Sequence, residues 1–380
     1  MAPGVTVPDS RIVSIEIVRA AAILLMVQVH FVQHLSAWEA SAGWLYTFSS
    51  VIGYLPAPMF CVVAGLSYSL WQRKAWAAGQ CDSAIDKATV RRGLALIGLG
   101  LLVAFFLWFP EEMFLWDILP LLGASFVLLA PLRRLPAQLN VLIGAMLLLI
   151  APVMRALCDY PAYWLTGEYS YDPAITEIVH GFLANGYFPL IPWLSVPIAG
   201  FVVGETIFRQ PEDAAGLRLR LVRAGTILVA VSAVLLAAMP RLPAVVSTHY
   251  GIGLTFYPAS AEYLLLTVGL TLLALAALNR LVDTNPAVRR HGPVMRFLRR
   301  YSSFALTVYI AHLAAHLLPL WAYGAMMGHE DPTYYYQRAV TTPTALGLAL
   351  VFIALFAVVL AALERHRKWS VETLLRWCAD

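Results

Sequence analysis

Charged residues are scarce in this chain. Asp, Glu, Lys and Arg together make up 13% of its 380 residues, whereas hydrophobic residues make up 60%. With a mean hydropathy of +0.73, this composition excludes an ordinary soluble domain and is typical of a polytopic helical membrane protein. We therefore expect an all-α fold embedded in a bilayer.

Cysteine is also rare, and the few residues show neither CxxC nor metal-ligand spacing. The chain has four, Cys61, Cys81, Cys158 and Cys378. No disulfide and no bound metal are expected. The chain shows no internal repeat of the kind found in transporters and no low-complexity linker. We expect residues 1–10 to be a disordered lead-in and residues 11–380 to form a single transmembrane domain.

Long apolar stretches are abundant, each near the ~20 residues that a bilayer-crossing helix needs. They lie at residues 13–34, 45–71, 91–109, 116–132, 137–157, 189–208, 219–239, 259–279, 302–323 and 343–363. The first stretch is too long, and too polar on one face, for a cleaved signal peptide. The sequence therefore predicts a membrane helical bundle of about ten transmembrane helices.

Basic residues are largely confined to one side of these stretches. All but four of the 26 Lys and Arg residues lie after the second, fourth, sixth and eighth stretches or near the chain ends. Arg155, Arg241 and Arg338 lie on the other side, and Arg19 lies within the first stretch. By the positive-inside rule, both termini are predicted to be cytoplasmic, in the inner membrane of a bacterium. The net charge of +4 thus reflects topology, and no nucleic-acid partner is expected.

The first stretch carries ionisable residues on one face. Arg19 and His30 are eleven residues apart, which on a helix returns to within about 20° of the same direction. Glu16 and His34 fall about 60° to either side and Gln33 about 40° away. Ionisable groups at membrane depth are costly, so by default they indicate a functional site that faces the protein interior.

Four sequence blocks follow one another along the chain. They are Ser14-Ile15-Glu16 with Arg19-x10-His30, Pro58-Met59-Phe60…Gly65, Phe188-Pro189-Leu190-Ile191-Pro192-Trp193 and Leu306-Thr307-x-Tyr309-Ile310-x-His312. Together they resemble the transmembrane acyltransferase superfamily, which includes acyltransferase-3 proteins and relatives of the heparan-α-glucosaminide N-acetyltransferase catalytic domain. Where that family usually has Asp and Arg-Gly on the first helix, this chain has Glu16 and Arg19-Ala20.

This resemblance implies an acyltransferase that takes an acyl group, most often acetyl, from cytoplasmic acyl-CoA. The acceptor is expected to be a hydroxyl or amine of a glycan, an amino sugar or a glycolipid on the outer side. Acetyl-CoA is thus expected as the donor substrate. Aromatic residues of the longest outer loop, among them Tyr160, Trp164 and Tyr187, are compatible with a carbohydrate, although an interfacial aromatic belt also accounts for them.

Within this interpretation, His30 is the candidate catalytic base. A buried imidazole that stays neutral can accept a proton from the acceptor as it attacks the thioester, and an acyl-histidine intermediate is the covalent variant. Arg19 is expected to meet the donor as it enters the bundle. Glu16, three residues earlier, is placed to pair with Arg19. A helix-end ion pair at the inner interface and a packed, hydrogen-bonded histidine are the structural alternatives.

Further residues complete the predicted site. Arg19, Arg91, Arg92 and Arg300 are candidates for binding acyl-CoA, and the positive-inside pattern explains Arg91 and Arg92 equally well. A second group is expected to contact or orient the acceptor or His30, and it consists of His34, His312 and Trp193.

Two interpretations from other classes stay open. The His-x3-His pairs, His30/His34 and His312/His316, have the spacing for ligands of a haem or a metal in a bundle core. The polar stripe of the first helix also suits a pathway for a lipid-linked sugar in a transporter. The absence of Soret absorbance in purified protein would exclude the haem interpretation, and loss of the acyl-CoA thioester would argue against the transporter. A homodimer formed through outward-facing apolar spans is a further expectation.

Overall fold

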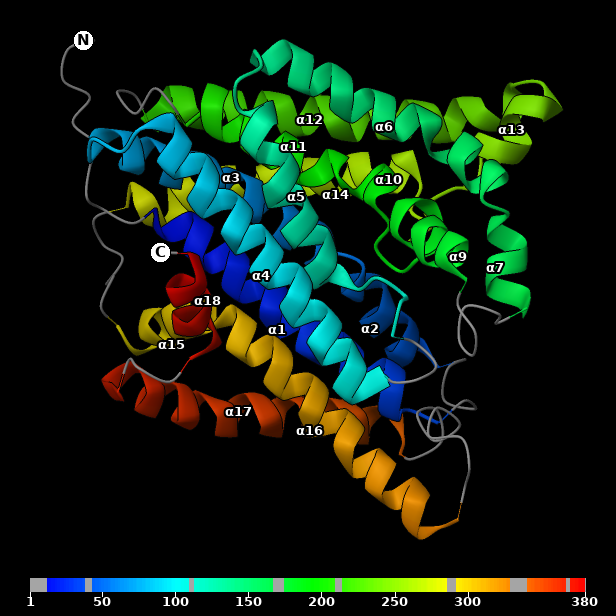
Figure 1. Cartoon of the computed structure of the whole chain (residues 1–380), viewed down its shortest axis with the longest axis vertical. Coiled ribbons are helices and arrows are strands. Elements are labelled where there is room, and N and C mark those ends of the chain that lie inside the picture. Colours follow the sequence, from blue (N-terminus) through cyan, green and yellow to red (C-terminus); the bar gives the residue numbers. More distant parts are fainter. Residues whose placement is uncertain are drawn as a thin grey trace. The chain divides into compact units, whose positions relative to one another are not determined.

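The structure is a computed structural model that describes residues 12–37, 43–108, 113–166, 174–208, 214–285, 292–328, 340–366 and 370–379. The secondary structure of these residues is helical, and the β-type pairing among them is one isolated bridge between Ser36 and Val340. Figure 1 shows the helices coloured along the chain. The predicted lead-in, residues 1–10, lies outside the described ranges.

The structure describes the following helices in chain order. They are α1 (Val13–Leu35), α2 (Trp44–Gly53), α3 (Pro56–Ala77), α4 (Asp82–Trp108), α5 (Ile118–Leu132), α6 (Ala137–Leu157), α7 (Tyr160–Thr166), α9 (Ile175–His180), η2 (Gly181–Asn185), α10 (Leu190–Trp193), α11 (Ser195–Thr206), α12 (Ala214–Ala238), η3 (Met239–Arg241), α13 (Ala244–Tyr250), α14 (Ala261–Leu278), η4 (Asn279–Asp283), α15 (Pro293–Ser303), α16 (Ala305–Met326), α17 (Thr342–His366) and α18 (Val371–Ala379).

Nine helical segments in the described part of the chain are long and apolar enough to cross a membrane. They are α1, α2 with α3, most of α4, α6, α9 through α11, α12 with η3, α14 with η4, α16 and α17. This confirms the predicted all-α polytopic membrane bundle. The side of the membrane on which each terminus lies stays a prediction.

The fourth predicted span, residues 116–132, corresponds to α5, which has only 15 residues. At 1.5 Å per residue its length is about 22 Å, shorter than the ~30 Å hydrocarbon core. Its start is defined by Asp117, whose side chain accepts a hydrogen bond from the Ile118 backbone N–H at 2.6 Å. Just beyond its end, Arg133 pairs with Asp82 and Asp86 at the beginning of α4. The polar groups at both ends explain why this helix is short.

By their contacts the described residues form two compact units. The first unit comprises the described parts of Met1–Ser14, Phe60–Pro286 and Leu375–Asp380. The second comprises those of Ile15–Met59 and Ala287–Leu374. Each unit is described below by itself. The predicted single domain over residues 11–380 stays a prediction.

In the first unit, α4 and α5 approach each other closely at two glycines. A Cβ atom on Gly123 would lie 2.5 Å from the Gly93 carbonyl oxygen, and one on Gly93 would lie 2.6 Å from the Gly123 carbonyl oxygen. Such distances leave no room for a side chain at either position. Small residues at a crossing let helix backbones pack directly against each other, as is common in membrane bundles.

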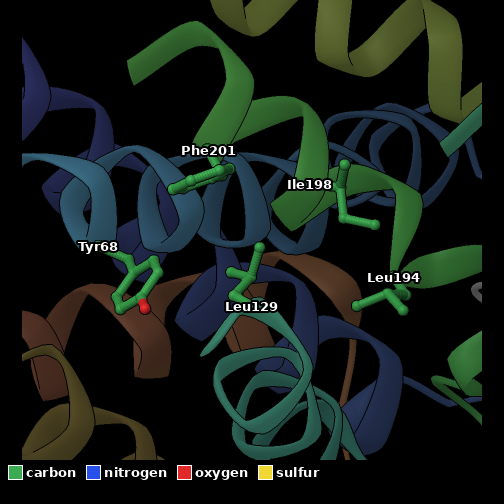
Figure 2. Packing of buried hydrophobic residues seen from close by; sticks show 5 residues of the cluster. All are labelled: Tyr68, Leu129, Leu194, Ile198 and Phe201. Atoms are coloured by element: carbon green, nitrogen blue, oxygen red, sulfur yellow. The ribbon is translucent and has the colours of Figure 1, made fainter. Parts of the chain in front are cut away.

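A hydrophobic cluster fills the space between α3, α5 and the α10–α11 segment of the same unit. Figure 2 shows its buried side chains, which are Tyr68, Leu129, Leu194, Ile198 and Phe201. All of them are at least nine-tenths buried. Because van der Waals contacts hold helices together where lipid surrounds the bundle, this cluster connects three segments that are far apart in sequence.

In the second unit, α1 is connected to α17 by backbone hydrogen bonds. The Val340 N–H donates to the Leu35 carbonyl at 3.0 Å, and the Ala37 N–H donates to the Val340 carbonyl at 2.8 Å. The Tyr301 hydroxyl of α15 donates to the Ile353 carbonyl of α17 at 2.5 Å. The two backbone bonds lie next to the end of α1 and the start of α17, and the Tyr301 bond adds α15 to the same body.

The beginning of α16 is capped by a side chain from α18. The Glu372 carboxylate accepts hydrogen bonds from the backbone N–H groups of Leu306 and Thr307, at 2.8 and 2.9 Å, and from the Thr307 hydroxyl at 2.6 Å. The first N–H groups of a helix have no partner within the helix, and its positive end attracts an anion. The C-terminal helix therefore fixes the start of α16, the helix that carries His312 and His316.

Candidate active site

The candidate site is built on α1, the continuous helix that carries the predicted polar stripe. Apolar residues such as Val18, Ile23 and Val27 on this helix are almost completely buried. Arg19 and His30 are half-buried. The two histidines of α1 thus lie on a helix that is otherwise mostly apolar. Ionisable side chains in such surroundings indicate a functional site.

His30 contacts α16 directly. Its Nδ1 atom lies 2.8 Å from Nε2 of His312, and the two rings are stacked with centroids 5.1 Å apart. His312 is fully buried. The structure thus brings together the predicted catalytic base and a residue that the sequence predicted only to orient a partner.

A second histidine pair lies one helical turn further along. Nδ1 of His34 lies 2.7 Å from Nε2 of His316, and these ring centroids are 4.8 Å apart. Because both pairs are spaced by four residues on their helices, equivalent rings recur on the same face of α1 and of α16. The result is a stack of four imidazoles in two hydrogen-bonded pairs.

Backbone carbonyls determine which nitrogen of each α16 histidine carries the proton. Nδ1 of His316 lies 2.6 Å from the His312 carbonyl oxygen, and Nδ1 of His312 lies 3.3 Å from the Val308 carbonyl oxygen. A carbonyl only accepts, so in the neutral rings Nδ1 is the donor and Nε2 is the acceptor.

The protonation of the α16 histidines also determines which nitrogen carries the proton in the α1 histidines. Since Nε2 of His312 accepts, the hydrogen bond to it must come from a proton on Nδ1 of His30. In a neutral imidazole the proton on Nδ1 leaves the lone pair on Nε2. His316 determines the tautomer of His34 in the same way. The α16 histidines therefore hold the α1 histidines in the tautomer whose Nε2 accepts a proton.

Aromatic side chains of the same unit contact the two α16 histidines. The Tyr309 ring lies 5.6 Å from the His312 ring, and the Phe31 ring lies 5.2 Å from the His316 ring. Phe31 also contacts Phe352 of α17. Apolar neighbours limit the access of water and strengthen the polar interactions within the site.

The hydrogen bonds of the ring nitrogens can be compared with what a haem or metal site requires. Both ring nitrogens of His312 and of His316 are engaged in hydrogen bonds. Among the residues that the structure describes, no three or more His, Cys, Asp or Glu side chains are placed to hold one metal ion. The four histidines are arranged as donor and acceptor pairs, and not as ligands that converge on one point.

Glu16 and Arg300 each have a partner that the sequence did not indicate. Glu16 is 9% exposed, and its Oε2 atom accepts a hydrogen bond from Nε of Arg299 at 3.1 Å. Arg300 pairs with Glu364 of α17 at 2.8 Å. The run of basic residues in α15 signals an inner interface, but nothing in it identifies Arg299 as the partner of Glu16. The predicted pairing of Glu16 with Arg19 stays a prediction.

The remaining predicted residues belong to the first unit. Arg91 is exposed on α4, and the guanidinium of Arg92 lies over the Trp71 ring, 4.9 Å from its centroid. Trp193 is fully buried against Phe188, with ring centroids 4.9 Å apart. The roles of these residues in binding the donor or the acceptor stay predictions.

Fold and site together define the class of protein, a multi-pass membrane protein with a histidine site within one helical unit. Residues 11–237 match the family described as heparan-alpha-glucosaminide N-acetyltransferase, catalytic. Because this match covers more than half of the chain, the chain belongs to that family and is a membrane acetyltransferase by class. The resemblance found in the sequence is confirmed. No individual curated protein matches the chain.

The family match includes α1 with Glu16, Arg19 and His30, and it ends before α16. His312 and His316 therefore lie outside the matched residues. Their part in the site follows from the hydrogen bonds described above.

Proposed function

We propose that the protein transfers an acetyl group from cytoplasmic acetyl-CoA to an acceptor on the outer side of a bacterial inner membrane. The acceptor is a hydroxyl or amine of a glycan, an amino sugar or a glycolipid. Membership of the family supports the reaction class. The observation that carries the site assignment is the hydrogen bond between His30 and His312, which leaves Nε2 of His30 as the proton-accepting nitrogen.

In the proposed reaction, Nε2 of His30 removes the proton from the acceptor O–H or N–H. The acceptor oxygen or nitrogen then attacks the thioester carbonyl carbon, and the carbon–sulfur bond breaks. The CoA sulfur leaves with the proton that the imidazolium returns, so the products are free CoA and the acetylated acceptor. While His30 is protonated, its Nδ1–H continues to donate to His312, which keeps the ring oriented.

The basic residues are proposed to hold the donor. CoA carries several phosphates, and guanidinium groups bind phosphate through paired hydrogen bonds. Arg91, Arg92 and Arg300 are proposed to bind these groups at the cytoplasmic side, and Arg19 to meet the part of the donor that enters the membrane. Glu16 is proposed to position the arginines, which its ion pair with Arg299 supports.

Two further side chains are assigned to the acceptor. His34 and Trp193 are proposed to contact or orient the acceptor. His34 lies one turn from His30 on the same helix and is held in the same tautomer.

Two copies of the chain are proposed to associate through their apolar outer faces.

The decisive experiment measures the release of free CoA and the transfer of label from radiolabelled acetyl-CoA by purified protein in liposomes. Wild type is compared with His30→Ala and Arg19→Ala, and His366→Ala at the exposed end of α17 is the control. We expect His30→Ala to lose turnover by roughly 10²-fold or more while it still binds CoA. We expect Arg19→Ala to weaken donor binding.

Three outcomes would contradict parts of the proposal. Equal turnover in wild type and His30→Ala would exclude His30 as the base. Label that stays covalently attached to the protein before the acceptor is added would favour an acetyl-histidine intermediate over direct transfer. If wild type moves a lipid-linked sugar across the liposome membrane without consuming acetyl-CoA, the transporter interpretation is correct.

A further inference from the structure

A cavity of about 270 Å³ lies within the first unit, and none of its lining residues is a histidine. It is formed where α6 and α12 end and α14 begins, and α13 contributes Tyr250. Its walls are mostly apolar side chains of Leu, Ala, Val and Met. Binding sites for drug-sized ligands measure about 300–1,000 Å³. This cavity therefore suits a smaller group, such as the headgroup of a lipid.

An acidic side chain in the cavity wall lacks a full set of partners. Glu262, in the first turn of α14, is 2% exposed. Its Oε2 atom is buried and has no hydrogen-bond partner among the residues that the structure describes. A buried carboxylate oxygen without a hydrogen-bond partner is costly, and an N–H donor in the cavity would relieve this cost. Glu262 thus indicates that the cavity takes a ligand with such a donor.

A basic side chain lines the same cavity from another helix. Arg155 lies in the last turn of α6, is half-buried and lines the cavity together with Glu262. Within the described ranges, the two side chains do not form a direct ion pair. The cavity therefore presents the Arg155 guanidinium and the Glu262 carboxylate as separate groups. A ligand that carries both an anion and a cation can bind to the two at once.

The position of the cavity connects it to the lipid phase. The polar groups come from the ends of membrane-spanning segments, the level at which lipid headgroups lie. Two of its apolar lining residues, Leu149 and Val231, are 57% and 42% exposed on the faces of α6 and α12. The Tyr250 hydroxyl donates to the Leu149 carbonyl at 2.9 Å, which fixes α13 beside α6. Acyl chains can thus run along the apolar faces while the headgroup occupies the cavity.

We propose that this cavity binds an amino-phospholipid of the phosphatidylethanolamine type, with its ammonium at Glu262 and its phosphate at Arg155. The ammonium supplies the N–H donors that the buried Oε2 atom lacks. A phosphatidylcholine headgroup has no N–H, and a phosphatidylglycerol headgroup has no cation. The site therefore selects among lipids by hydrogen bonding and charge, independently of the acetyltransferase reaction.

The test is native mass spectrometry of the delipidated full-length protein titrated with phosphatidylethanolamine, phosphatidylcholine or phosphatidylglycerol. We expect wild type to retain phosphatidylethanolamine about tenfold more tightly than either of the other lipids. Glu262→Gln should remove this preference, and Arg155→Gln should weaken the retention of all three. Glu177→Gln, which changes a half-buried acid outside the cavity, is the matched control and should behave as wild type.

A second variant keeps the test informative if Glu262→Gln is poorly folded. Ala145→Leu adds volume to the cavity wall without changing any charge, and it should also abolish the preference for phosphatidylethanolamine. Equal retention of the three lipids by wild type, or an unchanged preference in Ala145→Leu, would overturn the proposal. Displacement of the bound lipid by soluble phosphoethanolamine at the same concentration would overturn the assignment to a membrane lipid.

Discussion

At the scale of single residues, the two histidine pairs show how one side chain determines the protonation of another. The His312 Nδ1 proton is directed to a carbonyl of its own helix, so its Nε2 atom accepts from His30. His30 therefore depends on α16 for both its orientation and its tautomer. His312 is a positioning residue, because it acts through His30.

The first prediction tests that dependence. In His312→Ala, Nδ1–H of His30 loses its acceptor and the ring is no longer held in one orientation. We expect kcat for acetyl transfer to fall roughly 10- to 100-fold, since misplacement by about 1 Å can cost 10²-fold. The KM for acetyl-CoA should stay close to that of wild type. Steady-state kinetics at several donor concentrations separates the two constants.

The matched variant is His316→Ala, which removes the equivalent partner of His34. Because His34 is not the proposed base, its effect on kcat should be smaller. A larger fall in kcat for His316→Ala than for His312→Ala would show that His34, and not His30, accepts the proton.

At the scale of elements, close helix crossings and helix ends decide where the helices lie. The α4–α5 crossing depends on the absence of side chains at Gly93 and Gly123. The start of α16 depends on Glu372, which lies on a different helix. A prediction for each can be checked on purified protein in detergent.

Gly123→Ala should weaken the α4–α5 crossing. The added Cβ atom would lie 2.5 Å from the Gly93 carbonyl oxygen and 2.9 Å from the Ile97 backbone nitrogen, so the helices must move apart. Overpacking of this kind costs about 1–3 kcal/mol, and we expect a lower thermal unfolding midpoint. Gly98→Ala is the control, because a Cβ atom there would have no atom within 4 Å. If the two variants unfold at the same temperature, the close crossing is not important for stability.

Glu372→Ala should destabilise the beginning of α16. The change removes the acceptor of two backbone N–H groups and of the Thr307 hydroxyl. Loss of a helix cap typically costs about 0.5–2 kcal/mol. Since α16 carries His312, acetyl transfer should also decrease. Thermal unfolding and initial rates measured on the same sample check both effects.

Glu364→Ala provides the comparison, because it breaks an ion pair whose carboxylate is 49% exposed. Exposed pairs contribute at most about 1 kcal/mol. A midpoint for Glu372→Ala that is no lower than that for Glu364→Ala would contradict the capping role.

At the scale of the whole molecule, the distribution of basic residues predicts the topology. The positive-inside pattern predicts that both termini lie in the cytoplasm. Cys81 and Cys378 are exposed free cysteines, and Cys61 and Cys158 are buried. The native cysteines therefore serve as topology probes, since Cys81 and Cys378 are both predicted to lie on the cytoplasmic side.

A thiol reagent that does not cross membranes should label neither Cys81 nor Cys378 in intact cells and should label both after permeabilisation. A hydrogen bond with Ser83 lowers the pKa of the Cys81 thiol, so more of it is the reactive thiolate, and Cys81 should react faster than Cys378. Thr248→Cys, on the predicted outer side, should be labelled in intact cells. Labelling of Cys378 without permeabilisation would reverse the predicted orientation.

The sequence by itself determined the features that follow from composition and helical periodicity. Length and hydropathy predicted the membrane spans, and steps of about 100° per residue placed Arg19 and His30 on one face of α1. The equal spacing within His30/His34 and His312/His316 also predicted that each pair shares a face. These properties are local, because they depend on residues within a few turns of each other.

Only the tertiary structure decided which faces meet. His30 and His312 are 282 positions apart, and Glu16 and Arg299 are 283 apart. Periodicity defines a helix face, but it does not identify the helix that packs against it. The same reason explains why the sequence did not reveal that Glu262 and Arg155 line one cavity.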